Sequence, residues 1–226
     1  MSCGPSPSIV ATWDEGEAPG WETPGWEALT AWATTARAGH DGANRMNVAD
    51  LLVDSFGRIR QAVHGTVDGL TPEQLGLRPE AGSNSIAWLV WHLTRIEDDH
   101  LAAVAQAEQV WTSGGWSERF ALPFGQEETG YGHGPDDVAA VIVESGTLLT
   151  GYHDAVHEET LRYVTRLTGP ELDRIVDTRW DPPVSLGVRL VSVLADGLEH
   201  AGQAAYVRGM IERRQAGRAP VRGVPG

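Results

Sequence analysis

Several residue types and segments are missing from this sequence, and each absence excludes a class of chemistry. All 17 basic residues are arginine, so no lysine can act as a nucleophile or form a Schiff base. The only cysteine is Cys3, which excludes an intramolecular disulfide and is consistent with a reducing cytoplasm. Thiol chemistry deep in the fold therefore requires a thiol that comes from outside the chain.

Long apolar runs and positive charge are also lacking. No apolar stretch reaches the roughly 20 residues of a membrane-spanning helix. Residues 1–7 have neither the basic start nor the apolar run of a signal peptide. The net charge is −14 over 226 residues, whereas nucleic acids and anionic membranes bind basic surfaces. We therefore expect a cytoplasmic protein with neither nucleic acid nor a membrane as a partner.

The composition divides the chain into three parts. Residues 1–45 are rich in proline and glycine, and no helical or strand period persists there. We predict that they form an N-terminal extension that is disordered, acts as a lid, or precedes a natural start at Met46. Residues 46–214 are predicted to form one domain, and residues 215–226 a flexible C-terminal tail.

The sequence pattern of residues 46–214 predicts helices. Asn47 is a good N-cap, and apolar residues then recur at the 3–4 spacing of one buried stripe. Asp177–Pro183 cannot be helical through its two prolines. Further helices are predicted at approximately Ile86–Gln109, Pro135–Leu167 and Ser185–Arg213, with short helical turns starting at Thr71 and Thr168.

Four long helices with short joins predict an all-α protein, a four-helix bundle. One connection is long: about 25 glycine-rich residues separate the second and third long helices, and loops of that length are usually functional or mobile. This loop is aromatic between Trp111 and Tyr131, so we expect it to wall a pocket.

One pair of residues in the last predicted helix suggests a metal site. Asp196 and His200 are four residues apart, so both project from one face of the helix. An acid on an apolar stripe needs a partner or an ion. His92, on the apolar second helix, can supply a third ligand and leave an open position, as in catalytic zinc sites. The same spacing also fits a structural Asp–His hydrogen bond.

A rival pair lies on the third predicted helix. His153 and His157 are also four residues apart. Their neighbours Asp154, Glu158 and Glu159 favour an exposed helix face rather than a zinc site.

The sequence resembles the DinB superfamily, and most closely its actinobacterial mycothiol-transferase branch, which is related to mycothiol-dependent maleylpyruvate isomerase. The resemblance covers residues 46–214 and is carried by Ala87–Leu93, Asp181–Pro183, His200–Gln203 and Arg208. It implies a DinB-type four-helix bundle, often a homodimer, with a divalent metal that is usually zinc or nickel.

The resemblance also implies a set of ligands. The family uses one histidine on the second helix and a His-x-x-x-His pair on the last. His92 and His200 match this pattern, and Asp196 stands where the middle histidine is usual. A carboxylate can ligate zinc, so the departure leaves a chemically ordinary His/His/Asp set.

The function implied is that of a metal-dependent thiol S-transferase. Mycothiol, or a similar small thiol, would be the co-substrate and would attack an electrophilic small molecule as a metal-bound thiolate. Gln203 and Arg208 are the residues expected to contact the thiol, with no catalytic residue beyond the metal centre. The alternatives are a mycothiol-dependent isomerase of the maleylpyruvate type and a non-catalytic metal-binding stress protein, which Asp196 modestly favours.

Overall fold

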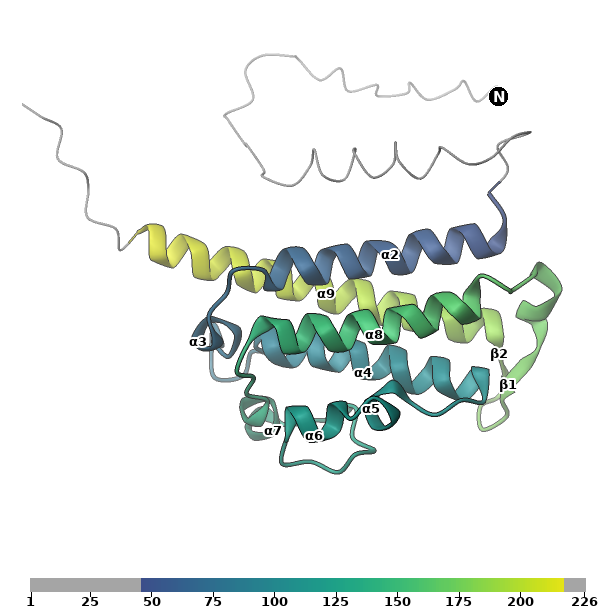
Figure 1. Cartoon of the computed structure of the whole chain (residues 1–226), viewed down its shortest axis with the longest axis horizontal. Helices are drawn as coiled ribbons and strands as arrows, with labels where there is room; N and C mark the ends of the chain where they lie inside the picture. Colours follow the sequence, from purple (N-terminus) through teal and green to yellow (C-terminus); the bar gives the residue numbers. More distant parts are fainter. Residues whose placement is uncertain (1–45, 218–226) are drawn as a thin grey trace, which may run out of the picture. The chain divides into compact units, whose positions relative to one another are not determined.

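A computed structural model describes residues 46–217 of the chain (Figure 1). The predicted extension over residues 1–45 lies outside the described residues, as does most of the predicted tail. Four long helices dominate: α2 (Val48–Val67), α4 (Ile86–Ala105), α8 (Gly146–Val164) and α9 (Leu186–Ala216). Helices α2 and α4 each pack against both α8 and α9, which closes a four-helix bundle. The predicted all-α fold is confirmed.

Short elements fill the connections. They are α3 (Pro72–Leu75), α5 (Val110–Ser113), α6 (Trp116–Phe120), α7 (Pro135–Ala140), the 3₁₀ helix η1 (Gly169–Asp173), β1 (Ile175–Asp177) and β2 (Val184–Ser185). Strands β1 and β2 form a small antiparallel ribbon that the sequence did not predict. None of the described helices has both the length and the apolar character needed to cross a membrane.

Side-chain caps start several helices where the sequence placed them. The side chain of Asn47 accepts from the backbone N–H of Asp50 at the start of α2. Ser85 accepts from the N–H of Trp88 and thereby starts α4. Thr71 forms a capping box at α3, as predicted. These caps satisfy N–H groups that a helix cannot pair internally.

The third long helix is shorter than predicted. The sequence suggested one helix from Pro135, but α7 ends at Ala140 and α8 begins at Gly146. A Cβ atom on Gly146 would lie 2.6 Å from Cγ1 of Val67, so the first turn of α8 approaches the end of α2 closely. A break before Gly146 allows this approach, which a continuous helical period along the sequence does not reveal.

Helix α4 is the most deeply buried element, because fifteen of its twenty residues are buried. One side of α4 faces α9 and another faces α8. Polar side chains on α4 therefore lie inside the protein and need partners there. The functional site depends on which partners each side provides.

Candidate metal centre

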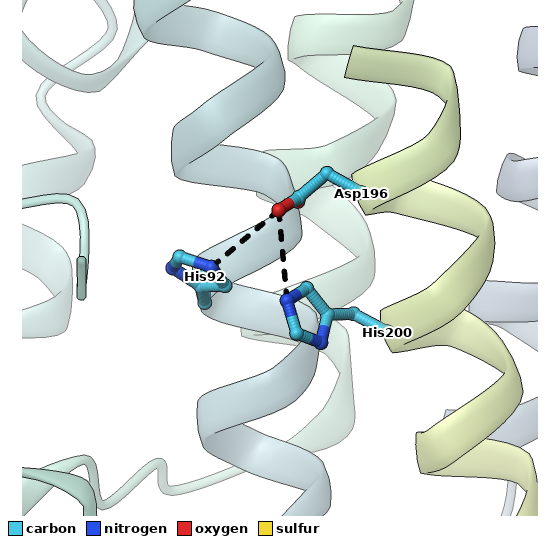
Figure 2. Close-up of side chains that lie close together, drawn as sticks. All are labelled: His92, Asp196 and His200. Atoms are coloured by element: carbon cyan, nitrogen blue, oxygen red, sulfur yellow. Dashed lines mark ion pairs between the residues drawn. The ribbon is translucent and has the colours of Figure 1, made fainter. Parts of the chain in front are cut away.

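Three ligand-type side chains meet between two helices (Figure 2). His92 comes from α4, whereas Asp196 and His200 lie one turn apart on α9. Oδ1 of Asp196 is 3.9 Å from Nε2 of His92 and 3.6 Å from Nε2 of His200. The structure thus brings together the three residues that the sequence singled out.

The spacing of the three residues suits one shared ion. One ligand atom from each residue lies within 4.8 Å of the other two. Tetrahedral ligands with bonds of about 2.0–2.1 Å stand roughly 3.3 Å apart, so the two contacts with Asp196 would shorten by about 0.6 and 0.3 Å. Across residues 46–217, no other set of three such side chains meets this spacing.

Both imidazoles are oriented by a hydrogen bond at Nδ1. Nδ1 of His92 donates to the backbone carbonyl of Thr129 at 2.6 Å, because a carbonyl oxygen can only accept. Nδ1 of His200 lies 3.1 Å from Oε1 of Gln203. Each bond leaves the lone pair on Nε2, the atom that faces Asp196. This is the arrangement by which outer partners orient metal-binding histidines.

The protonation states also suit a cation. Burial lowers the pKa of His92 to about 4, so its imidazole is neutral near pH 7. Burial raises the pKa of Asp196, while His200 opposes that change. Oδ2 of Asp196 is buried and finds no hydrogen-bond partner among the described residues. A carboxylate with a buried, unpaired oxygen beside the neutral imidazole of His92 fits a bound divalent ion.

A tryptophan and a glycine complete the wall around His92. The ring of Trp88 stacks on His92, with centroids 4.6 Å apart and planes 13° apart, and meets His200 edge-on. Gly130 has φ +92, and a Cβ atom there would lie 2.8 Å from Nδ1 of His92. Glycine is therefore needed for the backbone after Thr129 to reach the imidazole.

The two residues expected to contact a thiol have different surroundings. Gln203 holds His200 and lines a groove of about 640 Å³ together with Leu89 and Tyr206. Arg208 lies farther along α9, where its NH1 donates to the carbonyls at the end of α2, including Asp68 at 2.7 Å. The structure thus places Gln203 beside the trio and Arg208 at a helix end.

The rival histidine pair is buried, contrary to the sequence interpretation. His153 is fully buried and His157 is 8% exposed. Nδ1 of His153 lies 3.2 Å from the hydroxyl of Thr94 on α4. The acidic neighbours suggested an exposed helix face. The carboxylate of Asp154 instead points away from the pair and accepts a hydrogen bond from Nε of Arg60. The pair gains no third ligand from the described part of the chain.

The long loop places its aromatic residues mainly in the interior. Trp111, Trp116 and Phe120 are buried, whereas Tyr131 is exposed. A cavity of about 240 Å³ is lined by Trp91, Trp111 and Phe124, among others. The loop therefore walls a cavity together with α4, although most of its aromatic surface packs into the core.

Sequence reasoning missed the residues that orient the ligands. Thr129 acts through its backbone carbonyl, so its side-chain type carries no signal. The Gly130-x-Gly132 pattern hinted at a turn with positive φ, which both glycines adopt. The position of Trp88, four residues before His92 on a predicted helix, could have indicated the stacking.

Comparison with known proteins identifies the family. The family model described as mycothiol-S-transferase matches residues 51–213, which is most of the chain. The chain belongs to this family. Its fold is also similar to the crystal structure of a conserved protein from Enterococcus faecalis, at 31% identity and a TM-score of 0.70, covering 75% of this chain and 99% of that one. No curated protein matches the chain.

Proposed function

We propose that the protein is a metal-dependent thiol S-transferase that joins mycothiol, or a similar small thiol, to an electrophilic small molecule. The observation that carries the proposal is the His92–Asp196–His200 trio, whose ligand atoms lie within 4.8 Å of one another. Membership of the mycothiol-S-transferase family supports it. The metal is proposed to be zinc, with nickel as the alternative, since imidazole suits both ions.

The chemistry needs an activated sulfur, and residues 46–217 contain no cysteine, so we propose that the sulfur comes from a small thiol. A divalent ion held by the trio would act as a Lewis acid and lower the pKa of an incoming thiol. Asp196 and the two histidines supply three ligands and leave room for a fourth. Trp88 excludes water from one side of His92 by stacking on it. A small thiol of this kind is abundant in a reducing cytoplasm, where we propose that the protein acts.

The groove beside Gln203 is the proposed site for the body of the thiol. It has a volume of about 640 Å³, and none of the arginines within residues 46–217 lines it. Its polar side chains are neutral except for Glu80, and Ser83, Asn84 and Gln203 offer hydroxyl and amide groups. Such a lining favours a neutral, hydroxyl-rich thiol such as mycothiol over a thiol with several carboxylates.

The decisive experiment combines metal analysis with a screen of thiols. The purified protein should contain about one zinc or nickel ion per chain, and mycothiol should conjugate to a model electrophile faster than glutathione does. The His200→Ala variant should lose both properties. Retention of the metal by that variant would remove the assignment of the site.

Two other functions use the same residues. An isomerase of the maleylpyruvate type would add the thiol to a double bond and then eliminate it, so incubation with maleylpyruvate and mycothiol distinguishes it. A non-catalytic stress protein is favoured only by Asp196 at the middle ligand position. Stoichiometric metal together with thiol conjugation would exclude that alternative.

We also propose that two copies form a homodimer through the outer face of α9. Exposed apolar or small residues recur there every three or four positions: Val188, Val191, Ala195, Leu198, Gly202 and Ala205. Valine occupies two of the three positions before Leu198, whereas the two positions after it are glycine and alanine. A two-fold axis at Leu198 would therefore set Val191 of one copy against Ala205 of the other.

The homodimer is tested by measuring mass in solution. Leu198→Glu should convert a dimer to a monomer without changing metal content. Ile142→Glu is the matched control, because Ile142 is exposed but lies before α8 rather than on α9. A dimer that survives Leu198→Glu would move the interface elsewhere.

A further inference from the structure

A fully buried arginine lies one turn after the metal ligand on α4. Arg95 has no exposed surface, and its guanidinium lies over the ring of Trp111 at 4.9 Å. A buried arginine must satisfy its donors inside the protein. NH1 donates to Oε1 of Gln109 at 2.8 Å and to the hydroxyl of Tyr152 at 3.3 Å, and Asp98 lies 3.7 Å away as its ion-pair partner.

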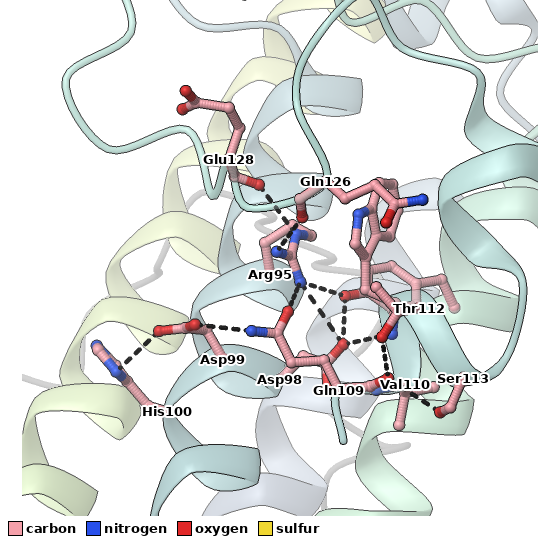
Figure 3. A network of polar contacts seen from close by, with 12 residues as sticks. Arg95, Asp98, Asp99, His100, Gln109, Val110, Thr112, Ser113, Gln126 and Glu128 are labelled. Carbon is pink, nitrogen blue, oxygen red and sulfur yellow. Dashed lines mark hydrogen bonds and ion pairs between the residues drawn. The ribbon is translucent and has the colours of Figure 1, made fainter. Parts of the chain in front are cut away.

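The remaining donors of Arg95 hold the far end of the long loop (Figure 3). Nε donates to the carbonyl of Glu128 at 3.1 Å, and NH2 donates to the carbonyl of Gln126 at 3.2 Å. These are backbone contacts, so the guanidinium fixes the path of the chain whatever the side chains there are. The planar fork of arginine suits such paired acceptors better than lysine does.

The near end of the loop is held by the same network. Oδ1 of Asp98 accepts from the N–H of Val110 at 2.8 Å, and Oδ2 accepts from the N–H of Trp111 at 2.7 Å. Arg95 and Asp98, three residues apart on α4, thus anchor both ends of one loop. The loop is tied to the helix that carries His92.

The residue after the anchored segment touches the metal ligand. Thr129 follows Glu128 directly, and its carbonyl accepts from Nδ1 of His92 at 2.6 Å. Gly130 then passes so close to the imidazole that a Cβ atom would lie 2.8 Å from Nδ1. The position of this carbonyl determines which nitrogen of His92 carries the proton and where Nε2 points.

We propose that Arg95 is a positioning residue for the metal centre: it holds the segment Gln126–Gly130 against α4, and that segment orients His92. Arg95 touches neither the trio nor a substrate, so its effect passes through the loop. The inference rests on the proposed metal centre, but its test does not require turnover.

The main test compares the zinc affinity of the full chain with that of two variants, by competition with a chelator. Arg95→Lys keeps the charge but cannot donate to both carbonyls in the same geometry. We expect zinc to bind at least about tenfold more weakly. Tyr152→Phe removes a member of the same network that does not contact Gln126–Gly130. It should lower the melting temperature and leave zinc affinity within about twofold. Wild-type affinity in folded Arg95→Lys would overturn the proposal.

A second pair of variants covers the case in which Arg95→Lys does not fold. Gly130 and Gly132 both have positive φ, but only Gly130 lies against His92, and a Cβ atom on Gly132 meets nothing within 4 Å. Both alanine variants carry similar backbone strain. Gly130→Ala should weaken zinc binding, whereas Gly132→Ala should not. Equal affinities would show that the segment does not orient the ligand.

A spectroscopic measurement separates this inference from the proposed function. In the metal-free protein, nitrogen NMR should show His92 protonated at Nδ1, and Arg95→Lys should give a mixture of the two tautomers. If the wild-type protein bound no metal, the proposed function would fail and this measurement would still decide the role of Arg95. An unchanged tautomer in Arg95→Lys would refute that role.

Discussion

Helix α4 presents polar side chains to two neighbours, and the two sides are built differently. Toward α9 it presents His92, which meets Asp196 and His200 with its Nε2 lone pair available. Toward α8 it presents Thr94 and Glu97, which contact His153 and Thr160. Asp196 and His200 remain partly exposed on the α9 side, whereas the four residues on the α8 side are buried.

The difference shows what makes a pair of residues a candidate ligand set. Each side contains an i, i+4 pair with histidine: Asp196 and His200 on α9, and His153 and His157 on α8. Among the described residues, only the α9 pair receives a third ligand-type side chain from the opposite helix. On the α8 side, the opposite helix offers a hydroxyl to His153, which suits a structural hydrogen bond. The side chain that α4 presents to each histidine-containing pair therefore determines the role of that pair.

The largest expected effect comes from a substitution that removes a side chain from the α9 side alone. His200→Ala should weaken zinc binding by about a thousandfold or more, because it removes one of three ligands from the trio. His157→Ala, the matched change on the α8 side, should leave zinc affinity unchanged. Equilibrium dialysis with elemental analysis of both variants measures the contrast. Equal losses would mean that the two pairs do not differ as described.

A smaller effect concerns the buried acid on the α8 side. Burial raises the pKa of Glu97 to about 7, although the Thr160 hydroxyl donates to it at 2.7 Å. The folded protein therefore binds more protons than the unfolded chain between about pH 4.5 and 7, so this group makes the protein less stable as pH rises through that range. Glu97→Gln should raise the unfolding free energy at pH 8 by about 1–3 kcal/mol, as measured by urea denaturation. It should have little effect at pH 4.5, and a gain equal at both pH values would argue against the charge as its cause.

The buried histidine should have the opposite pH dependence. Burial lowers the pKa of His153 to about 3, below the unfolded value near 6.5. The unfolded chain then binds more protons between these values, so this group's contribution to stability is lost as pH falls from about 6.5 toward 3. His153→Leu should reduce the difference in stability between pH 7 and pH 5 by about 1–2 kcal/mol. Urea denaturation at both pH values checks this, and an unchanged difference would contradict it.

The smallest expected effect comes from a substitution beside His200 on the α9 side. Gln203→Leu removes the acceptor for Nδ1 of His200 while keeping a side chain of similar size. Zinc affinity should fall by up to about tenfold, because Gln203 is exposed and water can replace it. Gly202→Ala, on the neighbouring exposed position, should leave zinc affinity unchanged. A loss as large as that of His200→Ala would indicate that Gln203 is itself a ligand.

Side-chain chemistry and spacing predicted a large part of this structure. Asn47 and Ser85 start helices because their side chains cap backbone N–H groups, a local effect that the sequence displays. The His92–Asp196–His200 trio was also predicted, from helical spacing and the family resemblance. The distances of 3.6 and 3.9 Å agree with that prediction.

The remainder depends on contacts between distant segments. The burial of His153 depends on α4 lying across it, and its acidic neighbours in sequence suggested the opposite. The start of α8 depends on Val67 meeting Gly146. The orientation of His92 depends on a backbone carbonyl, which every residue carries. No local pattern encodes these three features.

The aspartate in the trio has a consequence for charge. A divalent ion held by three neutral imidazoles keeps both of its positive charges, whereas in the proposed metal centre the carboxylate of Asp196 would cancel one of them. An anionic sulfur in the fourth position would then bring the whole centre to neutrality. Coulomb attraction between such a centre and its sulfur would be weaker than in a centre held by three histidines, so the sulfur would be released to an electrophile more readily.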